Sequence, residues 1–196
     1  RKVLVDEMAS TLQTVAKDVK VQVEFNPALV AEYRLIGYEN RMLREEDFRN
    51  DKIDAGEVGA GRAVTALYEV TPVGAKTLHG DRRYETSDKP VATAKHGNEL
   101  AYVRVRYKQP DGDSAVEFAQ SVGKPASIGN GSDDLRFAAA VAGFGQLLRG
   151  GKYTGPWSYS DAATLARGAT GKDEDGWRGE FVRLVKTADA LQRGGQ

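Results

Sequence analysis

The chain of 196 residues has no cysteine and no excess of charge of either sign. Without cysteine there are no disulfide bonds, no thiol nucleophile and no cysteine-ligated zinc site, although the redox compartment stays open. The 28 Lys and Arg balance 28 Asp and Glu, so no net positive field draws the chain to phosphate backbones or anionic lipid. Every apolar run falls short of the ~20 residues of a membrane span. We therefore expect no nucleic-acid partner and no membrane contact by this fragment itself.

Alternation of apolar and polar residues predicts strands in the first two thirds of the chain. From Val19 to Phe25 every second residue is apolar, and Asn26-Pro27 ends the pattern. We expect this strand to pair with the next one, and the last two strands to form a hairpin through 109–114. The further strand-like runs span residues 33–38, 64–70, 101–107 and 116–118.

A 3.6-residue period replaces the alternation after Ser132 and predicts helices at about 132–149, 160–167 and 175–192. Strands followed by helices favour an α+β fold. We expect an antiparallel β-sheet or small β-sandwich over residues 15–120, followed by a C-terminal group of about three helices over 132–192.

The first residues have helical spacing without a helix start, since Leu4, Met8 and Leu12 recur every fourth residue. We expect residues 1–14 to be the trailing helix of an upstream domain, and residues 15–196 to form a single α+β domain.

An acidic cluster in the polar segment after Arg41 is the first candidate site. Carboxylates can bind calcium or serve as a general acid and base. Arg44, Arg49 and Lys52 lie in the same segment and favour a solvated charged loop instead. Glu45 and Glu46 also belong to the cluster, and the acidic-loop candidates that we retain are Asp47, Asp51, Asp54 and Glu57.

The polar face of the strand at 101–107 is the second candidate. Tyr102, Arg104, Arg106 and Lys108 alternate with apolar residues and share this face. Interleaved aromatic and basic groups can stack on and pair with RNA or an acidic peptide, although long basic stems also shield the wet face of a sheet. The zero net charge favours the shielding role, and the functional option that remains for the four residues is a protein-contact face.

Four shorter motifs each lack a part of the site they resemble. Gly56-x-x-Gly59-x-Gly61 precedes a strand and lacks the Lys-Ser/Thr of a phosphate loop. Asp111-Gly112-Asp113 and Asp173-Glu174-Asp175-Gly176 lack the twelfth-position ligand of a calcium loop and suit a hairpin turn and a helix start. His79 and His96 have no ligand spacing for zinc. We predict no catalytic residue and no metal ligand here.

Four segments carry a family pattern, at residues 15–41, 54–72, 136–149 and 177–191. Together they resemble the C-terminal domain of unknown function of bacterial von Willebrand factor type A domain-containing proteins of the YfbK type. The resemblance implies an upstream A domain in an extracytoplasmic protein of the periplasm or cell surface, often lipid-anchored as a lipoprotein. It implies no catalytic residue and no cofactor in this fragment. A divalent cation would belong to the upstream A domain, whose Asp-x-Ser-x-Ser loop this sequence lacks.

The resemblance leads to the hypothesis of a non-catalytic protein-binding or scaffold module that positions or modulates the adjacent A domain. The partners would be that domain and an unidentified protein. The alternative is a hydrolase or ligand-binding domain that uses the acidic loop 45–57.

Overall fold

The computed structural model describes residues 13–37, 43–78, 80, 96–123 and 131–194. The chain divides into two compact units, residues 1–124 and 125–196, and each is described by itself. The helix expected at residues 1–14 lies outside the described residues up to residue 12, and Thr14 already belongs to the first strand. The organisation of residues 15–196 as one domain stays a prediction.

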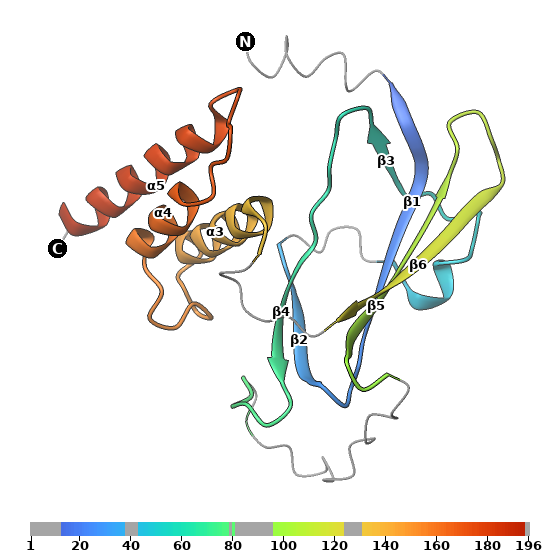
Figure 1. The fold of residues 1–196 in the computed structure, drawn as a ribbon, viewed down its shortest axis with the longest axis horizontal. Helices are drawn as coiled ribbons and strands as arrows, with labels where there is room; N and C mark the ends of the chain where they lie inside the picture. The colour runs from blue at the N-terminus through green and yellow to red at the C-terminus, as the bar shows by residue number, and fades with distance from the viewer. Residues whose placement is uncertain (1–12, 38–42, 79, 81–95, 124–130, 195–196) are drawn as a thin grey trace. The chain divides into compact units, whose positions relative to one another are not determined.

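The first unit contains two antiparallel sheets (Figure 1). The larger has four strands in the order β3-β1-β5-β6, and the smaller pairs β2 with β4. The expected α+β fold is confirmed, because three helices follow these strands. The strands are β1 Thr14–Phe25, β2 Val30–Ile36, β3 Gly56–Gly59, β4 Leu67–Pro72, β5 Glu99–Lys108 and β6 Ala115–Gly123, and the short 3-10 helix η1 spans Glu45–Asp47.

The two faces of the four-stranded sheet follow the alternation in the sequence. Val21 and Val23 of β1 lie opposite Val105 and Val103 of β5. The intervening pairs are polar, for example Lys20 opposite Arg106 and Gln22 opposite Arg104. The sheet therefore has one apolar and one polar face. The expected hairpin is confirmed, since β5 and β6 pair along nearly their whole length.

The expected pairing of the first two strands is wrong, because β2 pairs with β4. Asn26 explains the difference. Its side-chain Nδ2 donates to the main-chain oxygens of Glu99 at 2.8 Å and His96 at 3.1 Å, and its Oδ1 accepts from the main-chain amide of Ala28 at 3.0 Å. The main-chain oxygen of Asn26 also accepts from Val30. This local turn leads the chain out of the larger sheet, so β2 is free to join another strand.

The glycine-rich segment at 56–59, for which the sequence pattern predicts no strand, is itself a strand. β3 pairs with the start of β1. At Asp18 the register of β1 shifts in its pairing with β3 and also in its pairing with β5. Asp18 has a φ of 52°, in the left-handed region. Such a residue forms a β-bulge, and the bulge re-aims its side chain.

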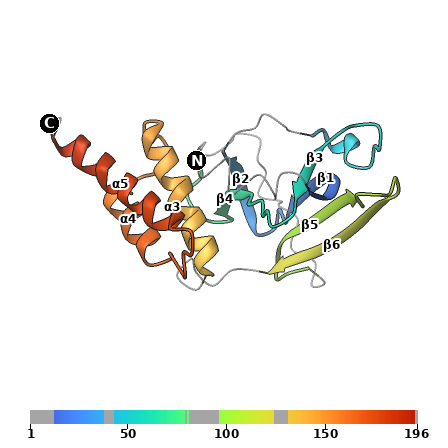
Figure 2. The same cartoon turned by 90° about the horizontal axis from the view of Figure 1, so that it is seen from above.

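The second unit consists of α3 Asp133–Leu148, α4 Tyr159–Arg167 and α5 Trp177–Gly194, which confirms the three expected helices (Figure 2). The first two helices begin at serine caps. The Ser132 hydroxyl accepts from the Leu135 amide, and Ser158 and Asp161 form a reciprocal capping box. Gly150 and Gly151, both in the left-handed conformation, follow α3.

Small side chains let these three helices approach closely. Ala140, Ala162 and Ala166 are fully buried, and the rings of Phe144 and Phe181 meet edge to face at 5.5 Å. Gly143 of α3 lies against the indole ring of Trp157, and a Cβ at position 143 would overlap that ring.

Candidate functional site

The segment 43–55 packs on the polar face of the larger sheet, and we call it the covering loop. Lys20 of β1 anchors it. The Lys20 ammonium donates to the main-chain oxygens of Asn50 at 2.6 Å and Asp47 at 3.2 Å. Lys20 is only 4% exposed, and Phe48 of the covering loop only 5%. A buried ammonium requires such acceptors, so the loop and the strand stabilise each other.

The acidic and basic candidates of the sequence are joined by this arrangement. The Arg106 guanidinium pairs with the Asp51 carboxylate at 2.7 Å. Lys108 pairs with Asp18 at 2.7 Å and lies 3.5 Å from the main-chain oxygen of Asp51. The hydrogen bond from Arg106 lowers the pKa of Asp51, and that from Lys108 lowers the pKa of Asp18 to about 2. The acidic loop and the basic strand face lie far apart in the sequence, and their charges thus neutralise each other in the fold.

A third ion pair joins the covering loop to the outer strand. Both carboxylate oxygens of Glu117 on β6 accept from Arg49, at 3.0 and 3.2 Å. Arg106 lies 3.8 Å from the same carboxylate. The bidentate contact with Arg49 lowers the pKa of Glu117, so this carboxyl group stays ionised.

The other acidic candidates have local roles. Asp47 lies in η1, where its carboxylate accepts from the side-chain amide of Asn50 at 3.4 Å. Asp54 accepts from the Ala55 amide at 3.1 Å, and Glu57 accepts from the Thr14 hydroxyl at 3.3 Å. The four acidic candidates therefore do not converge on one point.

The far end of the polar face is not covered by the loop, and we call it the open end. Arg104 stacks on the Tyr102 ring, with its guanidinium carbon 5.0 Å from the ring centre. The same guanidinium donates to Gln22 at 2.9 Å and lies 3.5 Å from Glu24. Tyr102 is 38% exposed. The predicted contact face is thus divided: Arg106 and Lys108 hold the covering loop, and Tyr102 and Arg104 stay partly exposed beyond it.

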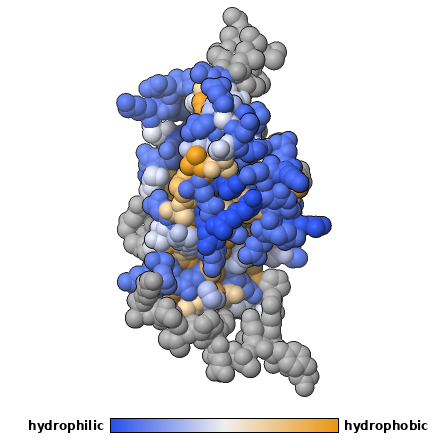
Figure 3. Space-filling model, turned by 90° about the vertical axis from the view of Figure 1, so that its right-hand side faces the viewer, coloured by the Kyte–Doolittle hydropathy of each residue, from blue (hydrophilic) through white to orange (hydrophobic). Residues whose placement is uncertain are grey.

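Figure 3 shows the side of the chain on which η1 lies in Figure 1. Hydrophilic side chains cover most of it, with smaller apolar areas between them.

Sequence reasoning missed Lys20, Asp18 and Glu117, which hold the covering loop and the larger sheet together. Their only signal is a polar residue at a strand position, which does not distinguish a buried anchor from a solvated side chain.

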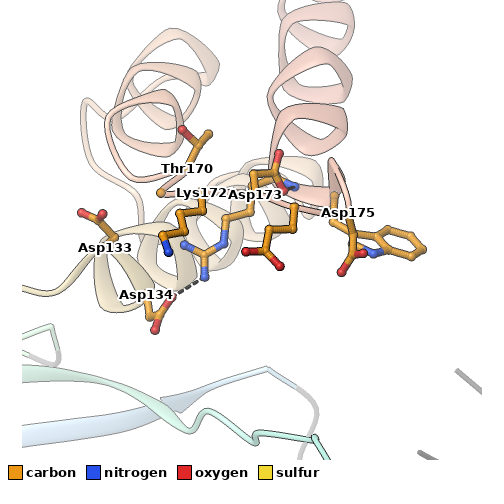
Figure 4. A pocket seen from close by; sticks show the side chains of 10 residues that line it. Asp133, Asp134, Thr170, Lys172, Asp173 and Asp175 are labelled. Carbon is orange, nitrogen blue, oxygen red and sulfur yellow. Dashed lines mark hydrogen bonds and ion pairs between the residues drawn. The ribbon is translucent and has the colours of Figure 1, made fainter. Parts of the chain in front are cut away.

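A pocket of about 560 Å³ lies in the second unit, where the start of α3 meets the loop between α4 and α5 (Figure 4). Asp134 forms an ion pair with Arg178 there. The Asp173 carboxylate accepts from the amides of Arg178 at 2.9 Å and Gly179 at 2.8 Å, which lowers its pKa. Asp173 thus caps α5, as the helix-start interpretation of 173–176 predicts. The other lining residues include Asp133, Thr170, Lys172, Glu174, Asp175 and Trp177.

The motifs set aside in the sequence occupy ordinary positions. Asp111-Gly112-Asp113 lies in the β5–β6 turn, and the His96 ring lies 3.1 Å from the carboxylate of Glu99, while His79 lies outside the described residues. Within the described ranges no three His, Cys, Asp or Glu side chains form a metal-ligating group. None of the described helices is both long enough and apolar enough to cross a membrane.

The Asp18–Lys108 pair predicts an acid dependence of stability. The pKa of Asp18 falls from 3.8 to about 2 on folding. Its contribution to the free energy of unfolding is therefore complete above pH 3.8 and is lost as the pH falls toward 2. We expect Asp18→Asn, which tolerates the left-handed backbone, to flatten the pH dependence of urea unfolding over this interval. Asp111→Asn, in the exposed turn, is the control, and an equal change in both variants would contradict the assignment.

Comparisons with known proteins place the chain in a family. Residues 10–191 match the family described as "Uncharacterized protein YfbK, C-terminal". The chain is 46% identical over 193 residues to "Uncharacterized protein YfbK" of Escherichia coli (strain K12), which covers 97% of this chain and 33% of that protein. The chain thus spans about a third of the length of this relative. No solved structure matches it. The chain therefore belongs to the family of YfbK C-terminal domains.

Proposed function

We propose that the chain is a non-catalytic protein-binding or scaffold module that positions or modulates an adjacent von Willebrand A domain in a bacterial cell-envelope protein. The proposal rests on the resemblance of the sequence to the C-terminal domains of such proteins. The length of the E. coli relative, of which this chain matches 33%, leaves room for further domains in that protein.

The open end is the observation that favours a protein contact. Tyr102 and Arg104 form a stacked, partly exposed pair, and Glu24 lies beside them. Aromatic and arginine side chains are enriched at the centres of protein interfaces, because they bury large areas and still satisfy their polar atoms. The Arg104 side chain is already held by Gln22 and Glu24, and the neighbouring Arg106 and Lys108 are held by the covering loop. The open end is therefore pre-organised and loses little entropy on binding.

The alternative function, a hydrolase or ligand-binding domain at the acidic loop 45–57, draws no comparable support. A general acid needs a raised pKa, whereas the pKa of Asp51 is lowered by Arg106. The four candidate carboxylates also point to separate partners.

The test is a titration of the chain with the separately produced A domain of the same protein, with and without magnesium. We expect binding that Arg104→Glu weakens at least about tenfold, since a charge reversal at an interface costs several kcal/mol. The matched control is Lys52→Glu, a charge reversal at an exposed position of the covering loop. A magnesium effect would indicate coupling to a cation site of the A domain.

Absence of binding at all concentrations would contradict the proposed function. Binding that is equally sensitive to Arg104→Glu and Lys52→Glu would contradict the assignment of the open end alone. Circular dichroism of each variant verifies that the fold is kept.

A further inference from the structure

The outer edge of β6 has no partner strand among the described residues. β6 is the last strand in the order β3-β1-β5-β6, and within the described ranges its backbone pairs with β5 alone (Figure 2). Eight of its nine residues are exposed. An unpaired edge presents a row of amide and carbonyl groups that can bond to another strand.

The edge also lacks the features that usually prevent such pairing. β6 has the sequence AVEFAQSVG, without lysine or proline. The register irregularity between β5 and β6 places its extra residue, Leu100, on β5, so β6 itself is regular. The single charge, Glu117, is held by Arg49 and Arg106. Proteins normally protect long edges with charges, prolines or bulges. Because β6 lacks these features, its edge can pair with another strand.

The sequence of β6 is complementary to itself. An antiparallel pair uses all nine residues when Ala119 faces Ala119 of a second copy. In this register Val116 faces Val122 of the second copy, and Glu117 faces its Ser121. No like charges meet, and apolar side chains that are exposed in the single chain, by 42% at Val116 and 42% at Val122, face each other.

We propose that β6 pairs with β6 of a second copy of this chain, in an antiparallel, two-fold arrangement centred on Ala119. Two four-stranded sheets then form one continuous sheet. Phe118, which is 54% exposed, lies on the same face as Val116 and gains neighbours from the second copy. The zero net charge of the chain leaves no long-range repulsion between the copies. The interaction needs no A domain and is independent of the proposed function.

The affinity of this pairing should be modest. Strand addition along one edge buries less than about 1,200 Å², which is typical of transient contacts. We expect a dissociation constant of roughly 10 µM to 1 mM, so the dimer forms at high concentration or when the chains are held together by other contacts.

The decisive experiment is a charge exchange at the symmetry centre, followed by sedimentation equilibrium over a wide concentration range. We expect Ala119→Lys alone and Ala119→Glu alone to weaken dimerisation at least about tenfold, because like charges then face each other. An equimolar mixture of the two variants should restore association as a mixed dimer. Val64→Lys, at an exposed position outside the strands, is the matched control and should dimerise as the parent chain does.

Three results would overturn the proposal: a chain that stays monomeric at all concentrations, dimerisation that is unchanged in both Ala119 variants, or a mixture that associates no better than either variant alone. Ala119 is exposed and lies opposite Arg104 of β5, so Ala119→Glu should keep the thermal unfolding midpoint of the parent chain and Ala119→Lys should lower it only slightly. That measurement separates a lost interface from a lost fold.

Discussion

Replacing Lys20 by methionine is expected to lower the free energy of unfolding of the strand unit by about 2–3 kcal/mol. The ammonium is buried and donates to the main-chain oxygens of Asp47 and Asn50. Methionine fills a similar volume but donates no hydrogen bond, so both carbonyl groups lose a charge-assisted partner. Lys20 also helps to lower the pKa of Asp51, after larger contributions from Arg106 and Lys108, and its loss removes this stabilisation of the carboxylate.

Urea unfolding followed by far-ultraviolet circular dichroism measures the effect of Lys20→Met. Relative to the parent chain, amide hydrogen exchange in Lys20→Met should become faster in the covering loop, and by more than in the β5–β6 hairpin. Lys52→Met is the matched control, because Lys52 is exposed in the same loop, and we expect a change within about 0.5 kcal/mol. Equal stability of Lys20→Met and Lys52→Met would show that the covering loop does not depend on the buried ammonium.

Replacing Gly143 by alanine is expected to destabilise the helical unit by about 1–3 kcal/mol. Alanine favours a helix by about 1 kcal/mol over glycine, so the intrinsic effect has the opposite sign. The new Cβ would overlap the Trp157 ring, which belongs to the side chains packed around Phe144 and Val185. The overlap decides the sign, because a closely packed core absorbs an added methyl group only by moving its neighbours.

Gly145→Ala is the control for the same helix, since a Cβ at position 145 meets no atom within 4 Å. It should stabilise the unit by up to about 1 kcal/mol. Both tryptophans of the chain, Trp157 and Trp177, lie in the helical unit, so tryptophan fluorescence during urea unfolding of Gly143→Ala and Gly145→Ala reports on this unit.

A double-mutant cycle tests the cause of the effect at Gly143. In a Trp157→Ala background, where the ring is removed, Gly143→Ala should become neutral or stabilising. A penalty that persists without the ring would contradict the packing argument. Because Trp157→Ala removes the fluorescence of Trp157, circular dichroism at the helix minimum follows this cycle.

The local elements could be predicted from the sequence. The alternation in β1 and β5 records which side chains share a face of the sheet, and the 3.6-residue period after Ser132 does the same for the faces of the helices. The helix start at Ser132 was readable because capping requires particular side chains within a few residues, whereas the second helix begins at its cap Ser158, two residues before the predicted start. Gly56–Gly59 was missed as a strand, since glycine has low strand preference and β3 depends on its pairing with β1.

The candidate site could be predicted only in part. The acidic loop and the basic face were both identified, but as separate and competing sites. Their meeting depends on contacts such as Arg106 to Asp51 and Lys20 to Asn50, which are 55 and 30 residues apart. Charge patterns state which groups need partners and do not state which partner each group finds.

The sequence by itself determined the fold class, the faces of the strands and helices, and the family membership, because these depend on local periodicity and on residue identity along the chain. Only the tertiary structure decided that β2 leaves the larger sheet at Asn26, that Lys20 is buried beneath the covering loop, and that β6 has no outer partner strand in the part of the chain that the structure describes. The physical reason is that strand pairing and ion pairing join residues distant in the sequence, and many pairings satisfy the same local pattern.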